Sequence, residues 1–293
     1  MRWTNDPTML ADMRDKVVVI TGANTGVGYA AAEQLGAKGA RLLLACRSAA
    51  KAAHAAQRLR HAVTDVDVTA VTMDLADRDS ISRGVAHIAR ITDRVDVLLN
   101  NAGVFLPAEQ QLVHGAEVHY GVNFLGHFSL TWQLAKLLRE AHAPRIVHVS
   151  SVTARWSKWR VEHIHARPHA GMAGYALSKL ANLVYALEIA RRWPDVVSVA
   201  SHPGYVATQL QRNLWLSKVG NPLLGSSPVT GAVPLVHAAS AAEVVSGSYW
   251  GPKRWPNLRA EIARIEPYRS AKGAALGRAV WQHAEQALEL PHS

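Results

Sequence analysis

Short apolar runs and longer helical patterns alternate along this chain, and this alternation constrains the fold more than any other feature. The run at 17–20, Val-Val-Val-Ile, is β-branched and ends at a glycine turn, which is typical of a buried parallel strand. Strands are predicted at 17–20, 41–46, 66–73, 95–99, 145–150, 196–201 and 248–250. Helices are predicted at 26–38, 49–61, 78–90, 117–142, 174–192 and 229–239. The pattern predicts an α/β fold with a doubly wound parallel sheet of about seven strands flanked by helices.

The chain is expected to form a single domain over 1–293. Its apolar content of 49% is sufficient for one large core, and no linker rich in Pro, Gly or Ser divides it. The C-terminal tail from 258 is helix-forming near its end and is expected to pack on an edge of the sheet.

Charge and cysteine content limit the expected partners and compartment. The net charge is +10, but Lys and Arg are dispersed, so a solvated basic surface is favoured over a nucleic-acid site. The chain contains no uninterrupted run of about 18 apolar residues, so no transmembrane segment is predicted. The N-terminus does not resemble a secretory signal. Cys46, the single cysteine, cannot form an internal disulfide, so a cytoplasmic location is expected.

Glycines at 22, 26 and 28 lie between the first predicted strand and the first predicted helix. Glycine lets the backbone turn tightly and approach a pyrophosphate, and the helix N-terminus offers N–H donors. A dinucleotide site on a Rossmann-type sheet is therefore predicted; a tight turn without a ligand is the alternative.

Cys46, Arg47 and Ser48 stand where many nicotinamide enzymes place an acidic residue for the ribose 2′-hydroxyl. A guanidinium binds a 2′-phosphate, whereas a carboxylate would repel it. The residues therefore favour NADP (NADPH) over NAD. Alternatively, Arg47 is only a surface cation.

Tyr175 and Lys179 are four residues apart and share one face of a predicted helix. The ammonium there is expected to lower the pKa of the phenol, and the hydroxyl of a nearby serine could hold a substrate oxygen. That chemistry suits carbonyl reduction or alcohol oxidation with a nicotinamide cofactor. On its own, the pair is more typical of an ordinary exposed helix.

The order and spacing of these motifs resemble the classical short-chain dehydrogenase/reductase family over about 16–252. They comprise the glycine turn, Asn-Asn-Ala-Gly at 100–103, Asn123, Ser-Ser at 150–151 and Tyr-x-x-x-Lys. The phrases at 45–47, 122–128 and 178–182 are similar to the retinol-dehydrogenase-like branch.

The resemblance implies a catalytic group of four residues. Tyr175 would be the general acid in reduction, and Lys179 would lower its pKa and bind the nicotinamide ribose. Ser151, rather than its neighbour Ser150, would bind the substrate oxygen. Asn123 would hold a water that links Lys179 to solvent, although it could instead be a structural asparagine in a kinked helix.

The resemblance also implies a set of cofactor-binding residues. Asp74 and Leu75 would lie near the adenine, unless Asp74 is a helix cap. The segment 203–208 would contact the nicotinamide amide, unless Pro203 and Gly204 form a simple turn. The full expected set is Gly22, Asn24, Thr25, Gly26, Val27, Gly28, Arg47, Ser48, Asp74, Leu75, Asn101, Ala102, Gly103, Tyr175, Lys179, Pro203, Gly204, Val206 and Thr208. His202 is expected to be a structural or rim histidine rather than a catalytic base, and no metal site is expected.

Ser151 and Tyr175 are 24 positions apart, about twice the spacing in compact family members. The intervening insert, 153–173, includes Trp156 and Trp159 and is predicted to form part of a substrate entrance, unless both rings pack on the protein body.

The sequence thus predicts an NADP(H)-dependent oxidoreductase that interconverts a carbonyl and an alcohol on an apolar or lipid-like small molecule. A non-catalytic dinucleotide-binding or sensing protein is the alternative. The resemblance also allows a homodimer paired through the helices at 117–142 and 174–192.

Overall fold

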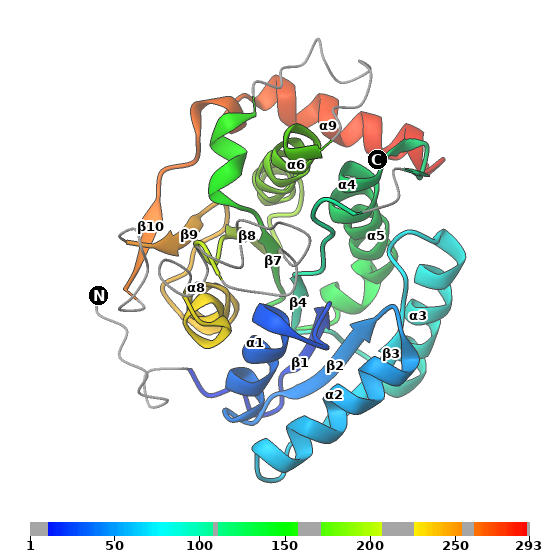
Figure 1. Ribbon diagram of the computed structural model, residues 1–293, viewed down its shortest axis with the longest axis vertical. Helices are drawn as coiled ribbons and strands as arrows, with labels where there is room; N and C mark the ends of the chain where they lie inside the picture. Colours follow the sequence, from blue (N-terminus) through cyan, green and yellow to red (C-terminus); the bar gives the residue numbers. More distant parts are fainter. Residues whose placement is uncertain (1–10, 108–110, 158–170, 207–225, 254–260, 292–293) are drawn as a thin grey trace.

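The computed structural model describes residues 11–107, 111–157, 171–206, 226–253 and 261–291. One sheet of eight strands forms the centre of this part of the chain (Figure 1), in the order β10-β9-β8-β7-β4-β1-β2-β3. The parallel strands are β1 (Val17–Thr21), β2 (Arg41–Cys46), β3 (Val68–Thr72), β4 (Val97–Asn100), β7 (Arg145–Val149), β8 (Val197–Ser201) and β9 (Tyr249–Pro252). The predicted Rossmann-type α/β fold is confirmed.

The eighth strand, β10 (Ile262–Ile265), was not predicted. It pairs antiparallel with β9, with Ala263 opposite Gly251. Its four residues, Ile-Ala-Arg-Ile, are too short a pattern to show as a strand in the sequence. The predicted C-terminal tail therefore supplies an edge strand as well as a helix.

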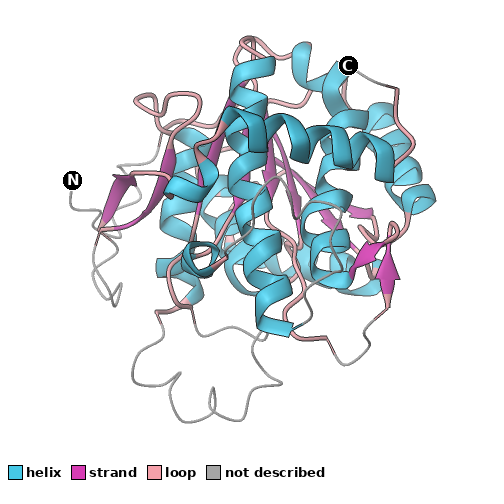
Figure 2. Ribbon diagram, turned by 90° about the horizontal axis from the view of Figure 1, so that it is seen from above, coloured by secondary structure: helices cyan, strands magenta, loops and turns pink. Residues whose placement is uncertain are grey.

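Helices cover both faces of the sheet (Figure 2). One face packs against α1 (Gly26–Gly36), α2 (Ala49–Ala62) and α8 (Pro228–Ser240). The other packs against α3 (Arg78–Ile91), α5 (Gly126–Arg139), α6 (Gly171–Arg192) and α9 (Ala274–Ala287). Side chains alternate between the two cores, so Val18 and Ile20 join the first and Val17 and Val19 the second. Burial on both faces explains why the run at 17–20 in β1 is apolar at every position.

The single helix predicted at 117–142 is divided in the structure. A hairpin of β5 (Leu112–Val113) and β6 (Ala116–Glu117) leads into α4 (Val118–Tyr120), a π-helical turn (Gly121–Leu125) and α5. Two glycines permit this path. A Cβ on Gly121 would lie 2.4 Å from the Val113 carbonyl oxygen, and a Cβ on Gly126 would lie 2.4 Å from the Leu75 carbonyl oxygen. The π turn contains Asn123, and π turns are frequent at functional sites.

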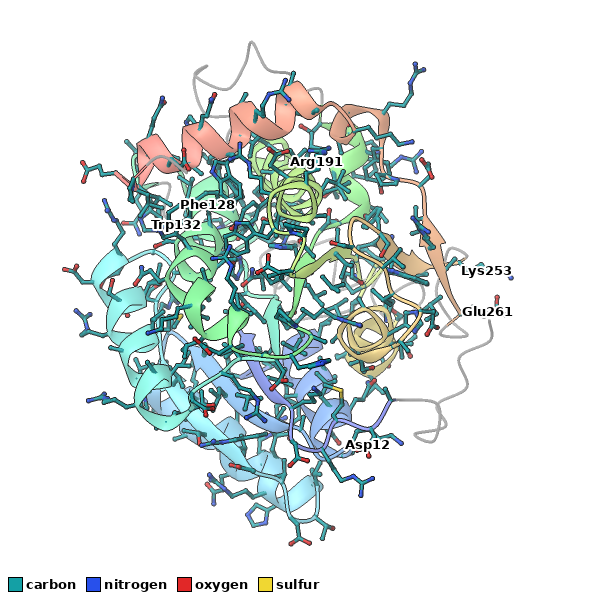
Figure 3. The ribbon with its side chains drawn as sticks, turned by 180° about the vertical axis from the view of Figure 1, so that it is seen from behind. Asp12, Phe128, Trp132, Arg191, Lys253 and Glu261 are labelled. Carbon is teal, nitrogen blue, oxygen red and sulfur yellow. The ribbon has the colours of Figure 1, made fainter. Side chains whose placement is uncertain are left out.

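Helix α9 lies across α5 and α6 through an aromatic cluster. The buried Trp281 ring is 5.0 Å from Phe128, 6.2 Å from Trp132 and 5.9 Å from Tyr185, measured between centroids. Figure 3 labels Phe128 and Trp132 below this helix. A homodimer through α5 and α6 would have to form beside α9, and such pairing stays a prediction.

Among the described residues, no helix combines the length and the apolarity that crossing a bilayer requires.

Candidate active site

A cleft of about 660 Å³ opens at the carboxyl ends of the parallel strands. It is lined by the segments that follow β1, β2, β3, β4, β7 and β8, together with Tyr175 and Lys179 from α6. Strands β1 and β4 are neighbours from which the chain proceeds in opposite directions across the sheet. Ligands of open α/β sheets bind at such a switch point.

The predicted glycine turn forms one end of the cleft. Gly22 and Gly26 adopt positive φ values of 67° and 61°, which favour glycine. Gly28 allows close packing instead, because a Cβ there would lie 2.4 Å from Nδ2 of Asn101. The side chain of Thr25, the N-cap of α1, forms no hydrogen bond with the first N–H groups of this helix. The turn can therefore accept a pyrophosphate.

The side of the cleft beyond the glycine turn contains Arg47, Asp74 and Leu75. Arg47 is exposed at the end of β2, and Ser48 caps α2 by accepting a hydrogen bond from Lys51 N. Asp77, not Asp74, is the N-cap of α3, so the alternative assignment of Asp74 as that cap is not supported. Asp74 instead accepts a hydrogen bond from Ala76 N at 3.0 Å, within the turn that lines the cleft.

Tyr175 and Lys179 meet in the cleft as the sequence predicts. Lys179 is 4% exposed, and its ammonium donates to the Val149 carbonyl at 3.0 Å. Burial lowers the pKa of Lys179 to about 8. The Lys179 nitrogen lies 5.7 Å from the centroid of the Tyr175 ring.

The structure contradicts the predicted lowering of the Tyr175 pKa by Lys179. Burial raises the pKa of the Tyr175 phenol to about 12, and a hydrogen bond with Ser151 opposes that shift. The Lys179 ammonium is instead bonded to a carbonyl of β7. Burial therefore outweighs the Ser151 hydrogen bond and keeps the phenol protonated at neutral pH.

The two adjacent serines have different environments. Ser150 is 1% exposed, and its hydroxyl donates to the Lys179 carbonyl at 2.8 Å. Ser151 is partly exposed in the cleft and bonds with Tyr175, while its Oγ also accepts from Thr153 N at 3.2 Å. These contacts favour Ser151 as the residue that could meet a substrate oxygen.

Asn123 is fully buried, and its side chain bonds to Val104 and to Ser178 of α6. Its Oδ1 accepts from Val104 N at 2.7 Å, and its Nδ2 donates to the Val104 carbonyl and to Ser178 Oγ. These bonds fix the loop that begins at Asn101, so Asn123 has a positioning role here. Its role in holding a water remains a prediction.

Sequence reasoning missed Thr21 and His127. Thr21 Oγ1 accepts from the backbone amides of Asn101 and Ala102, both at 2.9 Å, and lies 2.8 Å from Nε2 of His127. Nδ1 of His127 bonds to the Asn123 carbonyl at 2.9 Å. Thr21 and His127 thus connect the glycine turn to the catalytic group. A polar residue ending an apolar strand was the available signal for Thr21.

The segment after β8 lines the cleft with Pro203, Gly204 and Val206. His202 is buried, and its Nδ1 accepts from Gly204 N at 3.1 Å. Burial lowers the pKa of His202 to about 4, so it stays neutral and structural, as predicted. Thr208 lies outside the described residues.

The far end of the cleft is apolar. Its side chains include Phe105 and Val152, which the sequence did not identify, Met172 from the predicted insert 153–173, and Tyr205 from the predicted segment 203–208. Trp156 is 62% exposed, so its ring does not pack on the protein body. Trp159 and most of the predicted insert lie outside the described residues.

Metal binding finds no support in the described segments, where no three His, Cys, Asp or Glu side chains are grouped to hold an ion. The polar groups of the cleft suit an organic cofactor instead.

Comparisons with known proteins agree with this geometry. Residues 16–218 match the family model for short chain dehydrogenases. Retinol dehydrogenase 12 of Mus musculus is 35% identical over 256 residues, which cover 84% of this chain and 81% of that protein. A solved structure of an uncharacterized protein from Mycobacterium Paratuberculosis has a TM-score of 0.80 and 30% identity, with 100% of each chain covered. A second, of an NAD(P)-dependent gluconate 5-dehydrogenase candidate from Beutenbergia cavernae with bound NADP at low occupancy, has a TM-score of 0.67 and 26% identity, covering 82% and 96%.

The chain therefore belongs to the short-chain dehydrogenase/reductase family, within its retinol-dehydrogenase-like branch. Membership makes it an oxidoreductase that interconverts alcohols and carbonyls.

Proposed function

We propose that this protein reduces an apolar aldehyde or ketone with NADPH and catalyses the reverse oxidation with NADP. The observation that carries the proposal is the meeting of Ser151, Tyr175 and Lys179 in the same cleft as the glycine turn. A cofactor bound along the turn would reach the proton donor without leaving the cleft.

The choice of NADP rests on Arg47. Its guanidinium is exposed at the cleft, and the residues around it at the end of β2, Cys46 and Ser48, carry no carboxylate. A guanidinium forms charge-assisted hydrogen bonds with a phosphate. The solved relative with bound NADP supports the same choice.

Each catalytic side chain has a separate task in the proposed reduction. When bound, NADPH supplies the hydride. Ser151 and Tyr175 hold the substrate oxygen, and Tyr175 donates the proton to it. The pKa of about 12 keeps Tyr175 protonated at neutral pH. Lys179 supplies the positive charge that stabilises the phenolate left behind.

The apolar end of the cleft indicates the substrate class. Phe105, Val152 and Met172 offer carbon surface beyond the reacting centre, and Trp156 stands exposed at the same end. Burying such surface against a substrate is favourable, so a lipid-like or ring-bearing carbonyl fits better than a polar sugar. The single cysteine supports a cytoplasmic location as part of this proposal.

A panel of aldehydes and ketones with NADPH or NADH, followed at the nicotinamide absorbance, tests the proposal. We expect NADPH oxidation with at least one apolar carbonyl and weaker activity with NADH. NADPH binding without turnover on any carbonyl would favour the alternative, a sensing protein. Nucleotide binding alone requires no proton donor such as Tyr175 in the cleft.

A further inference from the structure

A buried acid–histidine pair lies beside the active site and has no part in the proposed proton transfer. Glu117 is 6% exposed and His119 is fully buried. One carboxylate oxygen of Glu117 lies 2.5 Å from Nδ1 of His119. The other accepts from the backbone amides of His119 and Tyr120, at 3.0 and 3.4 Å. The carboxylate thus caps α4 and holds the imidazole at the same time.

The hydrogen bonds define the tautomer of His119. Its Nε2 accepts from the backbone N–H of Leu106 at 3.0 Å, so this nitrogen carries no proton. The proton is therefore on Nδ1, from which it is donated to Glu117. Glu117 keeps the ring in the one orientation and tautomer that can accept from Leu106.

Leu106 needs such support. Its φ is +44°, a left-handed value that a leucine rarely adopts, and Pro107 follows it. A strained residue of this kind persists only when its surroundings fix it. Two residues earlier, Asn123 binds both backbone groups of Val104. The loop is thus held at Val104 by Asn123 and at Leu106 by His119.

Phe105 lies between these two fixed points and contacts the proton donor. Its ring meets Tyr175 edge-to-face, with centroids 4.7 Å apart, and both side chains line the cleft. The His119 ring also lies beside the Tyr175 ring directly, with centroids 6.0 Å apart. The side chain of Leu106 reaches toward Gly171, at the start of α6. The loop therefore sets the position of both the Tyr175 ring and the apolar wall.

We infer that His119, oriented by Glu117, is a positioning residue that fixes the 104–106 loop. This loop forms the wall that aligns a bulky carbonyl substrate with Tyr175. This inference rests on the proposed carbonyl reduction and adds a determinant of substrate shape to it. Releasing Leu106 should leave the glycine turn unchanged, because Asn101 and Ala102, which contact that turn, are held separately by Thr21. Arg47 follows β2 and should also be unaffected.

The test compares His119→Phe with His119→Gln. Phenylalanine preserves a ring beside Tyr175 but removes the acceptor, whereas glutamine can present an oxygen near the position of Nε2. A matched control is His237→Phe, because His237 is also buried against a ring, that of Trp250, and lies near Arg145 at the amino end of β7. Benzaldehyde and propanal serve as ring-bearing and short substrates.

In His119→Phe, we expect kcat/KM for benzaldehyde to fall roughly tenfold, the effect of one lost buried hydrogen bond. Propanal should lose less, and the Kd for NADPH should stay within about twofold. Hydrogen exchange at the Leu106 amide should accelerate, with little change elsewhere. His119→Gln should retain most of the wild-type kcat/KM for benzaldehyde and most of the protection of the Leu106 amide from exchange. His237→Phe should change neither quantity.

Unchanged hydrogen exchange at Leu106 in His119→Phe would overturn the inference. So would a loss of kcat/KM that is the same for benzaldehyde and propanal and the same in His119→Phe and His237→Phe. If His119→Phe does not fold, the double variant Glu117→Gln with His119→Phe removes the buried charge and is judged by the same readouts. If the wild-type protein reduces no carbonyl, the proposed function fails, and exchange at Leu106 alone decides whether His119 holds the loop.

Discussion

The two ends of the cleft are built in different ways. The cofactor end uses backbone and small residues, such as Gly22, Gly28 and Ala102, whose positions depend on close approach. The substrate end uses large apolar side chains, including Phe105, Met172 and Trp156. The first end recognises a fixed cofactor through exact geometry, whereas the second offers carbon surface to a range of shapes.

Tyr175 stands at the boundary between these two ends. It shares α6 with Lys179, contacts Ser151 after β7, and packs against Phe105 from the loop after β4. Changes at the cofactor end should therefore alter the choice of nucleotide, and changes at the substrate end the choice of carbonyl. Changes at Tyr175 should abolish the reaction with every substrate.

The largest expected effect is that of Tyr175→Phe. Loss of the phenolic proton should lower kcat by about 10²- to 10⁴-fold, the usual contribution of general acid catalysis. NADPH binding should persist, because the glycine turn is untouched. NADPH oxidation with an aldehyde that the wild-type protein reduces measures the first effect, and fluorescence titration the second. Tyr205→Phe, on the same cleft, is the control and should remain active. Wild-type turnover in Tyr175→Phe would refute the role of this residue.

Arg47→Asp should change the nucleotide preference at the cofactor end. A lost charged hydrogen bond is worth about 1.5–3 kcal/mol, so the NADPH-to-NADH affinity ratio should fall roughly ten- to a hundredfold. Calorimetric titration of both nucleotides measures the ratio. Arg58→Asp is the control, because Arg58 lies over the Tyr29 ring and does not line the cleft. An unchanged ratio in Arg47→Asp would place the phosphate elsewhere.

Reduction should weaken as the pH rises through about 8. Burial lowers the pKa of Lys179 to about 8, so the ammonium loses its proton there while Tyr175, with a pKa of about 12, keeps its own. Above this point kcat/KM should decline by up to about tenfold per pH unit.

The stability of the fold should change in the opposite direction over the same range. An unfolded chain binds the Lys179 proton more tightly than the folded one, with a pKa of 10.5 against about 8. This residue therefore makes the folded protein more stable as the pH rises from 8 to 10.5. A melting temperature measured at each pH separates loss of activity from unfolding. Constant kcat/KM up to pH 10 would contradict the assigned role of Lys179.

Trp156→Ala should have the smallest effect and should act only at the substrate end. Loss of about 1 kcal/mol of apolar contact would raise KM roughly fivefold for long-chain or ring-bearing carbonyls and leave propanal almost unchanged. Because the ring is 62% exposed, the melting temperature should hold. Equal losses for both substrate classes, with a lower melting temperature, would indicate a packing role instead.

The contrast between the two ends also explains what the sequence could predict. The glycine turn and Tyr-x-x-x-Lys have spacings that backbone and helix geometry fix, so these two motifs could be recognised in the sequence. Phe105, Thr21 and His119 follow no such spacing, and their contacts depend on which loops meet after folding.

The pKa of Tyr175 could not be predicted for a related reason. Spacing showed that Lys179 would be near, but only the folded structure shows that the ammonium bonds to Val149 and that burial dominates. The short strand β10 was missed because its pairing with β9 is decided by tertiary contacts.

Transfer of deuterium from NADPH to a carbonyl tests the central claim most directly. The protein would be incubated with NADPH that carries deuterium at both C4 positions and with an apolar aldehyde, and the alcohol analysed by mass spectrometry. Hydride transfer within one cleft predicts one deuterium on the carbinol carbon, and no alcohol from Tyr175→Phe over the same time. An alcohol without deuterium, or NADPH that binds and is never consumed with any carbonyl, would contradict the account.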